Sequence, residues 1–259
     1  MANKMIEFLI ESGAELTGSS VGAIIGGSVA GPGGAVAGIV GGKAVEMAFS
    51  KLGSEIQSRV LSKRENKKIG ATATYALSKI KENIEKGKQL RDDDFFEEDF
   101  TGRSKADEIM EGVMFSAQRE HEENKLKYYG NLVANIAFDK TVSREQANQL
   151  ISIAQKLSYR QIKLLNLYAI NQQIPKILLK NEDYSKNGIS GYKLISILQD
   201  TLELYHIGIV GGSGSVILEM AYINPSEIKV QGMGALLYNL MELSAMPYTE
   251  LEELISMLR

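Results

Sequence analysis

Cysteine and tryptophan are absent from this chain of 259 residues, and histidine occurs only twice, at His121 and His206. Without thiols there can be no disulfide scaffold, no thiolate zinc site and no cysteine nucleophile. His121 does not belong to an H-E-x-x-H zinc motif, because the fifth position of that pattern is Lys125. The sequence also shows no readable pair of catalytic carboxylates. We therefore expect neither an enzyme nor a bound metal or other cofactor.

A strong overall charge of one sign is lacking as well. The 29 Lys+Arg and 32 Asp+Glu residues give a formal net charge of −3, with 44% hydrophobic and 24% charged residues. These values are those of an ordinary globular chain, which excludes wholesale disorder. The near-neutral balance also argues against a protein that binds nucleic acid through bulk positive charge.

What the chain does have is glycine, 25 residues of it, concentrated near the N-terminus. Residues 16–42 read LTGSSVGAIIGGSVAGPGGAVAGIVGG and contain no charged side chain. The residues before this glycine block are acidic, so it does not fit a secretory signal peptide. Gly31-Pro32-Gly33-Gly34 should interrupt a helix and leave two arms. Each arm of roughly 13 residues would be about 20 Å long, shorter than a hydrocarbon core of ~30 Å.

The glycines of this block recur at helical spacing. Residues four apart share one face of a helix, and a row of glycines on that face lets two backbones approach closely, as in membrane GxxxG contacts. We therefore predict a glycine-zipper helical hairpin that is membrane-active; the alternative is a hairpin packed inside a soluble protein. A phosphate-binding loop is excluded, since Ala37 stands where its first glycine belongs and Ala44 stands where its Ser or Thr belongs. The predicted zipper residues are Gly18, Gly22, Gly26, Gly27, Gly31, Gly34, Gly38 and Gly42.

Charged residues flank the block on both sides. Glu7, Glu11 and Glu15 lie on one face of an N-terminal helix; they are either solvated or, if several copies assemble, face an aqueous lumen. Residues 43–88 carry 11 Lys+Arg against 5 Asp+Glu. We therefore expect a basic helix over 43–87 that binds the anionic headgroups of membrane lipids. The residues expected to make this contact are Arg59, Lys63, Arg64, Lys67 and Lys68.

An acidic segment follows the basic one. Residues 90–124 carry 4 basic and 12 acidic residues, and the core of the segment, 91–100, reads RDDDFFEEDF. Acidic runs usually form solvated linkers, but the interleaved Phe95, Phe96 and Phe100 favour docking on a groove or on the basic helix. We predict a linker that also serves as a latch, suppressing membrane contact until it is released.

Two serine-based capping boxes predict helix starts in the C-terminal region. Ser143 is followed by Gln146, and Ser158 by Gln161, each before apolar residues at helical spacing. The helices expected here cover 104–138, 144–157 and 159–171.

Beyond residue 189 the pattern changes to helix, strand, turn, strand and helix, which is typical of a winged-helix-like module. Gly211–Ser215 predicts the hairpin turn. Residues 159–259 carry 8 basic and 10 acidic residues, too few cations to neutralise DNA phosphates, so we expect a protein-recognition or oligomerisation module. The expected elements are a helix over 192–206, paired strands over 207–210 and 216–220, a short strand over 228–230, and helices over 235–242 and 249–258.

The glycine stretch at 18–42, the basic helix after it and the sensor-like region beyond resemble small bacterial or prophage-encoded abortive-infection effectors that carry a glycine-zipper membrane segment. The segment 125–161 also looks like uncharacterised proteins of such prophages. The resemblance implies anti-phage defence by triggered oligomerisation and pore formation.

Taken together, the sequence predicts a mainly α protein in three parts. These are a membrane-active segment at 1–42, a basic helix and acidic linker at 43–102, and a helical sensor or oligomerisation region with a winged-helix-like end at 103–259. The expected partners are membrane lipid, further copies of the chain and a phage protein as trigger, with no nucleic acid. The protein would rest in the cytoplasm and act at the cell membrane. The alternative is a soluble protein-binding or regulatory module.

Overall fold

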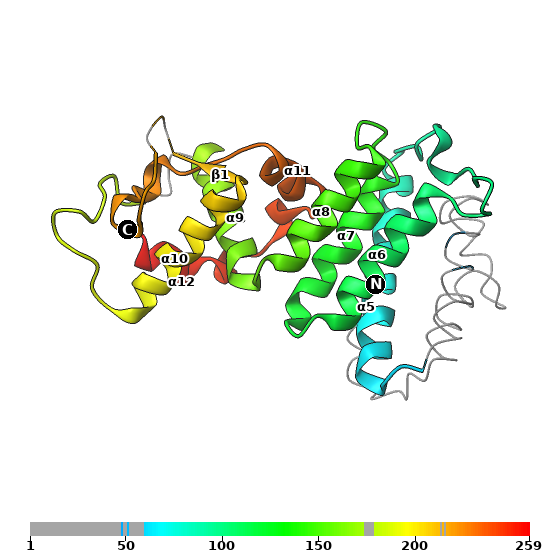
Figure 1. The fold of residues 1–259 in the computed structure, drawn as a ribbon, viewed down its shortest axis with the longest axis horizontal. Helices are drawn as coiled ribbons and strands as arrows, with labels where there is room; N and C mark the ends of the chain where they lie inside the picture. Colours follow the sequence, from blue (N-terminus) through cyan, green and yellow to red (C-terminus); the bar gives the residue numbers. More distant parts are fainter. Residues whose placement is uncertain (1–47, 49–50, 52–59, 174–178, 213, 215) are drawn as a thin grey trace. The chain divides into compact units, whose positions relative to one another are not determined.

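A computed structural model describes residues 48, 51, 60–173, 179–212, 214 and 216–259 of the chain (Figure 1). The predicted glycine zipper, the three glutamates of the N-terminal helix and Arg59 lie outside the described residues. The chain divides into two compact units, Met1–Gln155 and Lys156–Arg259. The boundary predicted between 102 and 103 falls inside the first unit. Each unit is described by itself below.

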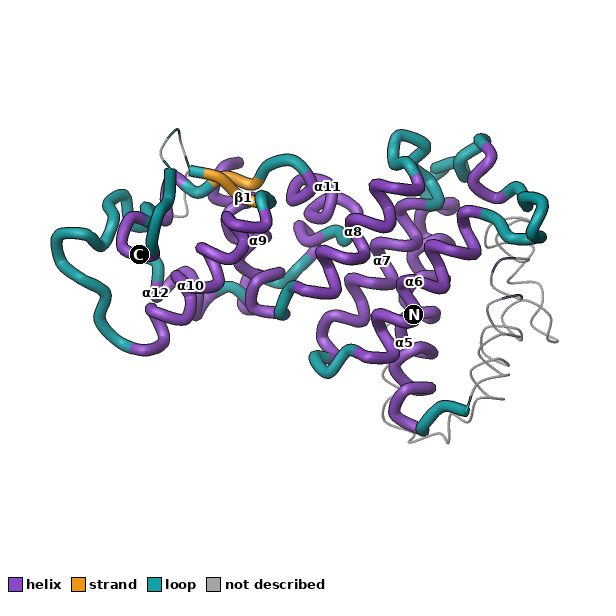
Figure 2. Tube along the Cα trace, in the orientation of Figure 1, coloured by secondary structure: helices purple, strands orange, loops and turns teal. Residues whose placement is uncertain are grey.

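The described part is mainly helical, as the sequence predicted (Figure 2). In the first unit α5 packs against α7 and α6, and the 3-10 turn η1 packs against α6. Within the described residues, no helix combines the length and apolarity needed to cross a membrane. The elements of this unit are α5 (Lys63–Glu85), η1 (Asp94–Phe96), α6 (Lys105–Arg119), η2 (Glu123–Lys125), α7 (Leu126–Ile136) and α8 (Arg144–Lys156).

The start of α5 corrects the prediction of one continuous basic helix over 43–87. Residues 60–62 are not helical, and the helix begins at Lys63 behind a reciprocal capping box. The Glu65 N–H donates to Ser62 Oγ at 3.3 Å, and the Ser62 N–H donates to Glu65 Oε2 at 2.8 Å. These bonds satisfy two otherwise orphaned donors. The Gln118 amide also donates to Glu65 and, together with Ser62, lowers the pKa of Glu65 to about 2.

The contact between α5 and α7 is a close approach of two backbones. A Cβ atom built on Gly130 of α7 would lie 2.6 Å from Tyr75 Cβ and 2.8 Å from the Thr72 carbonyl oxygen of α5. Ala76 of α5, whose backbone nitrogen would lie 2.9 Å from that Cβ, is fully buried. Glycine at position 130 therefore sets the distance between the two helices.

The predicted continuous helix over 104–138 is wrong, because the chain breaks between α6 and α7. Glu120 leaves the helix with φ −65° and ψ 134°. Its Oε1 atom accepts the N–H groups of His121 at 2.9 Å and Glu122 at 3.1 Å. The Glu120 carboxylate thus accepts the N–H groups that follow the end of α6. The next α-helix, α7, begins after η2.

The two capping boxes predicted from the sequence are confirmed. Gln146 N–H donates to Ser143 Oγ at 3.2 Å, and Ser143 N–H donates to Gln146 Oε1 at 2.9 Å. The same exchange joins Ser158 and Gln161 at 2.9 and 3.1 Å. The helices start where the boxes place them, α8 at Arg144 and α9 at Tyr159.

In the second unit α9 packs against α10, α11 and β2. The buried hydroxyl groups of Tyr168 in α9 and Thr201 in α10 lie 2.7 Å apart and join the two helices at their contact. The elements of this unit are α9 (Tyr159–Gln173), α10 (Tyr192–Ile207), β1 (Val210–Gly211), η3 (Met220–Tyr222), η4 (Pro225–Glu227), β2 (Lys229–Val230), α11 (Met233–Leu240), η5 (Leu243–Ala245), η6 (Tyr248–Glu250) and α12 (Glu252–Met257).

The sheet of this unit has two strands, but the predicted pairing of 207–210 with 216–220 is wrong. β1 pairs with β2 in antiparallel register, with Val210 opposite Val230. Gln231 fixes this choice, because its N–H donates to the Ile209 carbonyl at 3.1 Å and its side-chain amide reaches the Val210 carbonyl at 3.3 Å. The short strand predicted over 228–230 is thus the true partner of β1.

Candidate regulatory site

The acidic segment is anchored to the first unit by its own arginine. The Arg91 side chain is only 4% exposed and donates to both carboxylate oxygens of Asp93 at 2.7 and 2.5 Å. It also donates to the Ile136 and Val142 carbonyls at 3.4 and 3.0 Å, and lies 4.3 Å from the centroid of the buried Phe95 ring. The Arg91 guanidinium holds the pKa of Asp93 below its usual value. The segment is therefore docked on the unit.

Beyond this anchor, residues 98–104 form a tight turn. Asp99 Oδ1 accepts the Thr101 N–H at 2.8 Å, the Thr101 hydroxyl at 2.5 Å and the Arg103 N–H at 3.4 Å. The Thr101 hydroxyl is the main reason that the pKa of Asp99 is lowered. Gly102 has φ +75°, a conformation that favours glycine. The turn leaves Phe100, at its tip, fully exposed.

This turn binds a lysine that lies just after the glycine block. Lys51 Nζ pairs with the Glu98 carboxylate and donates to the Gly102 carbonyl at 3.1 Å, while Asp107 Oδ2 lies 3.5 Å away. The Glu98 hydrogen bond is the main reason that the pKa of Lys51 is raised. Ala48, three residues earlier in the sequence, is buried at 4% exposure. The acidic segment and the start of α6 therefore hold the chain that leads out of the glycine block.

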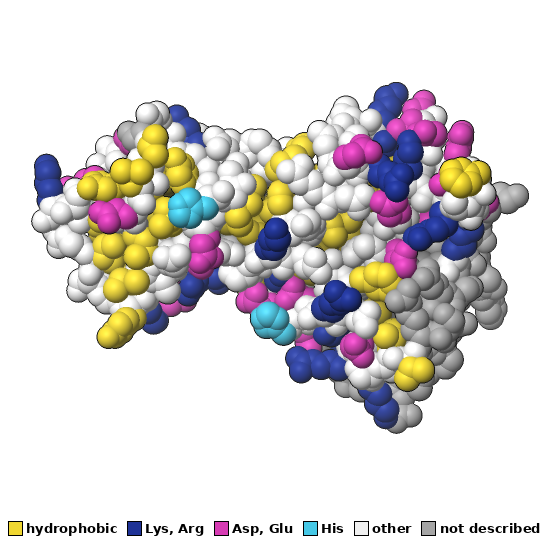
Figure 3. Space-filling model, viewed as in Figure 1, with side chains coloured by type: hydrophobic (Ala, Val, Ile, Leu, Met, Phe, Trp, Pro, Cys, Tyr) yellow, Lys and Arg dark blue, Asp and Glu magenta, His cyan; other side chains and the backbone are white. Residues whose placement is uncertain are grey.

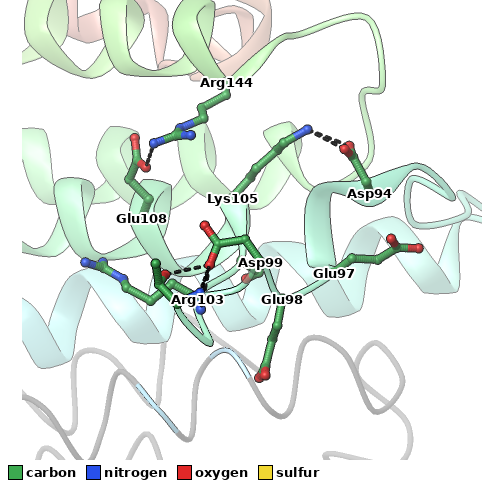
Figure 4. A pocket seen from close by; sticks show the side chains of 10 residues that line it. Asp94, Glu97, Glu98, Asp99, Arg103, Lys105, Glu108 and Arg144 are labelled. Atoms are coloured by element: carbon green, nitrogen blue, oxygen red, sulfur yellow. Dashed lines mark hydrogen bonds and ion pairs between the residues drawn. The ribbon is translucent and has the colours of Figure 1, made fainter.

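Charged side chains surround an open hollow of about 390 Å³ beside this contact (Figure 4). Lys105 Nζ lies 2.6 Å from Asp94 Oδ1, and Arg144 pairs with Glu108. The Arg144 hydrogen bond lowers the pKa of Glu108. Figure 4 shows Glu98 pointing away from these two pairs. The hollow is lined by Asp94, Glu97, Glu98, Asp99, Thr101, Arg103, Ser104, Lys105, Glu108 and Arg144.

The break between α6 and α7 holds a second charged cluster, centred on Glu120. Its side chain is 4% exposed and pairs with Lys125, whose side chain is 3% exposed. Tyr129 donates its hydroxyl to Glu120 Oε2 at 3.0 Å, and burial raises the pKa of that hydroxyl. Lys68 of α5 donates to the Glu120 carbonyl at 2.7 Å. Through Lys68, the cluster therefore links the break between α6 and α7 to helix α5.

Among the described residues, one trio places three potential metal-ligand atoms within 4.8 Å of one another: Glu120, His121 and Glu122. Both carboxylate oxygens of Glu120 already accept hydrogen bonds from the protein, and the His121 side chain is 90% exposed. This arrangement has the features of a capped chain break, and we assign no metal to it.

The described residues expected to contact headgroups differ in exposure. Lys63 and Arg64, in the first turn of α5, are exposed, and Arg64 lies 3.5 Å from Glu123. Lys67 is half-buried, while Lys68 is 8% exposed and its ammonium is bound to the Glu120 carbonyl in this conformation. Lys63 and Arg64 are therefore placed to reach a surface outside the protein.

The residues that build the site were only partly visible in the sequence. Arg91 is the single base in the run 91–100, and the D-F-T-G pattern ending at Gly102 is a turn signal. Ser104 and Asp107 form a capping box of the S-x-x-D type. No local pattern marks Lys51, because its contacts with Glu98 and Asp107 join residues that are far apart in the chain.

Comparisons with protein-family models, with curated proteins and with solved structures found no match to this chain. The site is therefore interpreted from its own contacts and charges.

Proposed function

We propose that the protein is a membrane-disrupting, pore-forming effector that serves in bacterial anti-phage defence and rests in the cytoplasm. A partner protein, for instance a phage protein, releases the glycine block, and copies of the chain then assemble at the cell membrane. The observation that supports this proposal best is the attachment of Lys51 to Glu98, Gly102 and Asp107, which connects the acidic segment to the chain that follows the glycine block. We call this contact the Lys51 latch.

The latch has the strength that a reversible switch requires. The side chains of Lys51 and Glu98 are 40% and 44% exposed, and exposed ion pairs contribute about 0–1 kcal/mol. A partner that prefers the released state by a few kcal/mol would shift the population between the two states. The resting state is then held by contacts that a binding event can overcome.

The glycine block supplies the element that would be released. Its uncharged length, with glycines four residues apart, suits close packing of helices in lipid as well as in protein. Lys63 and Arg64 lie exposed at the start of α5, where they can attract anionic headgroups. Lys68 would join them only if its bond to the Glu120 carbonyl opened.

One observation favours the alternative, a soluble protein-binding or regulatory module in which the glycine hairpin is an internal packing device. Ala48, six residues after the glycine block, is 4% exposed and so is buried within the protein. In this alternative the Lys51 latch is a permanent structural contact and the block never leaves the protein.

Dye release from vesicles of phosphatidylethanolamine and phosphatidylglycerol separates the two functions. Lys51→Glu places a carboxylate beside Glu98 and Asp107, and we expect dye release several-fold faster than with the wild type. The charge-swapped variant Lys51→Glu/Glu98→Lys should return toward the wild-type rate. Lys193→Glu is the matched control, since Lys193 is 76% exposed and pairs with Glu253 in the second unit.

Two results would contradict the proposal in different ways. If no variant releases dye, the chain is not membrane-disrupting and the soluble module is favoured. If Lys51→Glu and the wild type release dye at the same rate, the membrane activity is independent of the Lys51 latch.

A further inference from the structure

Phe100 is the most exposed aromatic side chain among the described residues, with a relative exposure of 100%. It lies at the tip of the turn formed by residues 98–104, which we call the Phe100 turn, and all residues of this turn are described. Two hydrogen bonds fix its backbone, from the Asp99 N–H to the Arg103 carbonyl at 2.9 Å and from the Gly102 N–H to the Asp99 carbonyl at 3.0 Å. Because the turn is already ordered, a partner that covers Phe100 loses little affinity to ordering it.

A single exposed apolar residue is common on protein surfaces and by itself indicates no partner. The surface beside Phe100 adds a second feature, an excess of negative charge. Five carboxylates and three cations line the hollow next to the Phe100 turn. Figure 3 shows acidic and basic side chains gathered together over this part of the first unit. All three cations are already paired with a carboxylate, in the pairs Arg103–Glu111, Lys105–Asp94 and Arg144–Glu108.

Two carboxylates next to Phe100 lack such a counter-charge. Within the described residues, neither Glu97 nor Asp99 forms a salt bridge. Together with Glu98, they place three consecutive carboxylates directly before Phe100 in the chain. Surfaces that associate have complementary charges, and like charges across an interface are costly. The partner that fits this surface is therefore apolar where it covers Phe100 and basic around that point.

This charge favours a protein over a membrane or a nucleic acid. The headgroups of anionic lipids and the phosphates of nucleic acids are negative, so the carboxylates of residues 97–99 would be repelled by both. A protein can place an apolar pocket and a positively charged rim on one surface. It is therefore the class of partner that satisfies Phe100 and its acidic neighbours together.

We propose that the Phe100 turn is the docking surface for the partner that releases the glycine block, and that this partner is a protein whose apolar pocket is bordered by Lys or Arg side chains. Phe100 enters the pocket, and Glu97 and Asp99 meet cations of the rim. Aromatic side chains in such pockets carry much of the binding energy of an interface. The inference rests on the proposed function, since it gives the chemistry of the partner that this function requires.

Docking at this surface is coupled to the Lys51 latch through Glu98. The Glu98 carboxylate pairs with Lys51 Nζ, which also donates to the Gly102 carbonyl of the same turn at 3.1 Å. A partner cation that binds Glu98 competes with Lys51 for the carboxylate, so the partner binds the released state more tightly. A ligand shifts an equilibrium only through such a difference in affinity. One surface thus recognises the partner and opens the latch.

Selection of peptides gives the first test. A library of random short peptides, displayed on filamentous phage, is selected on the immobilised full-length protein. We expect the enriched peptides to combine large apolar residues with an excess of Lys and Arg over Asp and Glu. A library that yields acidic peptides, or no enriched peptide, would overturn the proposal.

Titration of the most enriched peptide, carrying a fluorescent label, gives the second test, with dissociation constants from fluorescence anisotropy. Phe100→Ser should bind about tenfold more weakly than the wild type, the effect of losing a buried aromatic anchor. Glu97→Gln should bind severalfold more weakly. Tyr192→Ser is the matched control, because Tyr192 is 91% exposed and belongs to the second unit. Equal affinity of Phe100→Ser and the wild type would overturn the proposal.

The latch provides a third measurement with the same peptide. Lys51→Met should bind it about threefold more tightly than the wild type, since Glu98 is then free of its exposed ion pair. Lys193→Met, which loses an exposed pair in the second unit, should bind as the wild type does. If Lys51→Met and the wild type bind equally, the surface does not open the latch. If Phe100→Ser loses binding to phosphatidylglycerol vesicles and keeps the peptide, Phe100 contacts lipid and the proposal is wrong.

Peptide binding and dye release separate this inference from the function on which it rests. Dye release by Lys51→Glu, without peptides that depend on Phe100, leaves the pore function standing and overturns the docking surface. Peptides that depend on Phe100, without dye release by any variant, overturn the pore function and leave a soluble protein-binding module.

Discussion

At the scale of single residues, the break between α6 and α7 depends on Glu120. Burial alone would raise the pKa of Glu120, but Lys125, the Glu122 N–H and Tyr129 together stabilise the carboxylate and lower it. The cost of burying two charges is offset only while both are present, so removing one leaves the other uncompensated. Removing one member of the buried Glu120–Lys125 pair should therefore destabilise the fold by more than the intact pair stabilises it.

We expect Glu120→Gln to lower the free energy of unfolding by about 3–5 kcal/mol at pH 7, since Lys125 would stay buried without its counter-charge. Urea unfolding measures the change. Glu123→Gln is the control, because Glu123 is 53% exposed and lies 3.5 Å from Arg64. Loss of an exposed ion pair of this kind should lower the free energy of unfolding by no more than about 1 kcal/mol. Equal effects of the two substitutions would contradict the role given to Glu120.

The same substitution has a defined pH dependence. The folded pKa of Glu120 is below its unfolded value, so its stabilisation is complete above the unfolded pKa of about 4.3 and is lost as the pH falls through the folded pKa. The stabilities of the wild type and Glu120→Gln should therefore converge as the pH falls below the unfolded pKa and through the lower, folded pKa. A difference that stays constant down to acid unfolding would show that Glu120 does not act through its charge.

At the scale of helices, the α5–α7 contact tests whether close backbone packing is used in this chain. Gly130→Ala should lower stability by about 1–3 kcal/mol, because the new methyl group overlaps Tyr75 and the α5 backbone. Gly112→Ala is the matched control in the middle of α6, since its Cβ would lie 3.5 Å from Ile151 Cδ1, an ordinary contact. It should gain up to about 1 kcal/mol from helix propensity. Chemical denaturation measures both changes. If the two variants change the free energy of unfolding in the same direction, this account is contradicted.

Helix starts were the part of the fold that could be predicted from the sequence, because a capping box joins residues three apart. Ser143 and Ser158 begin helices as expected. The box at Ser62 obeys the same rule and was overlooked within a long basic run. The break at Glu120 has no capping pattern of this kind, and one of its contacts, from Lys68 to the Glu120 carbonyl, joins residues far apart in the chain.

The sheet and the candidate site were harder to predict from the sequence, because their contacts join residues that are far apart in the chain. The glycine-rich turn after β1 favoured a local hairpin, but Gln231 binds β1 from further along the chain. The acidic segment was expected to neutralise the basic helix. Within the described residues its core, 91–100, meets the basic region through Lys51, and further along Glu123 and Glu120 meet Arg64 and Lys68. Charge patterns predict that two segments attract each other and leave open which side chains meet.

At the scale of the whole molecule, the two kinds of ion pair should respond differently to salt. The Lys51 latch is half-exposed, whereas Glu120 and Lys125 are almost completely buried. The Debye length falls from about 10 Å at 0.1 M salt to about 3 Å at 1 M, and buried pairs are screened much less than exposed ones. Salt should therefore weaken the latch before it affects the folded units.

We expect elastase, which cleaves after small apolar residues, to cut the glycine block faster as salt is raised from 0.1 to 1 M, while the units around α5–α8 and α9–α12 stay intact. Lys51→Met should be cut at low salt as fast as the wild type at high salt, and should gain little from added salt. Lys193→Met should behave as the wild type does, because its partner Glu253 lies in the second unit. If salt leaves the cleavage of the wild type unchanged, the glycine block is held by apolar packing such as that of Ala48, and the exposed charges of the latch do not control it.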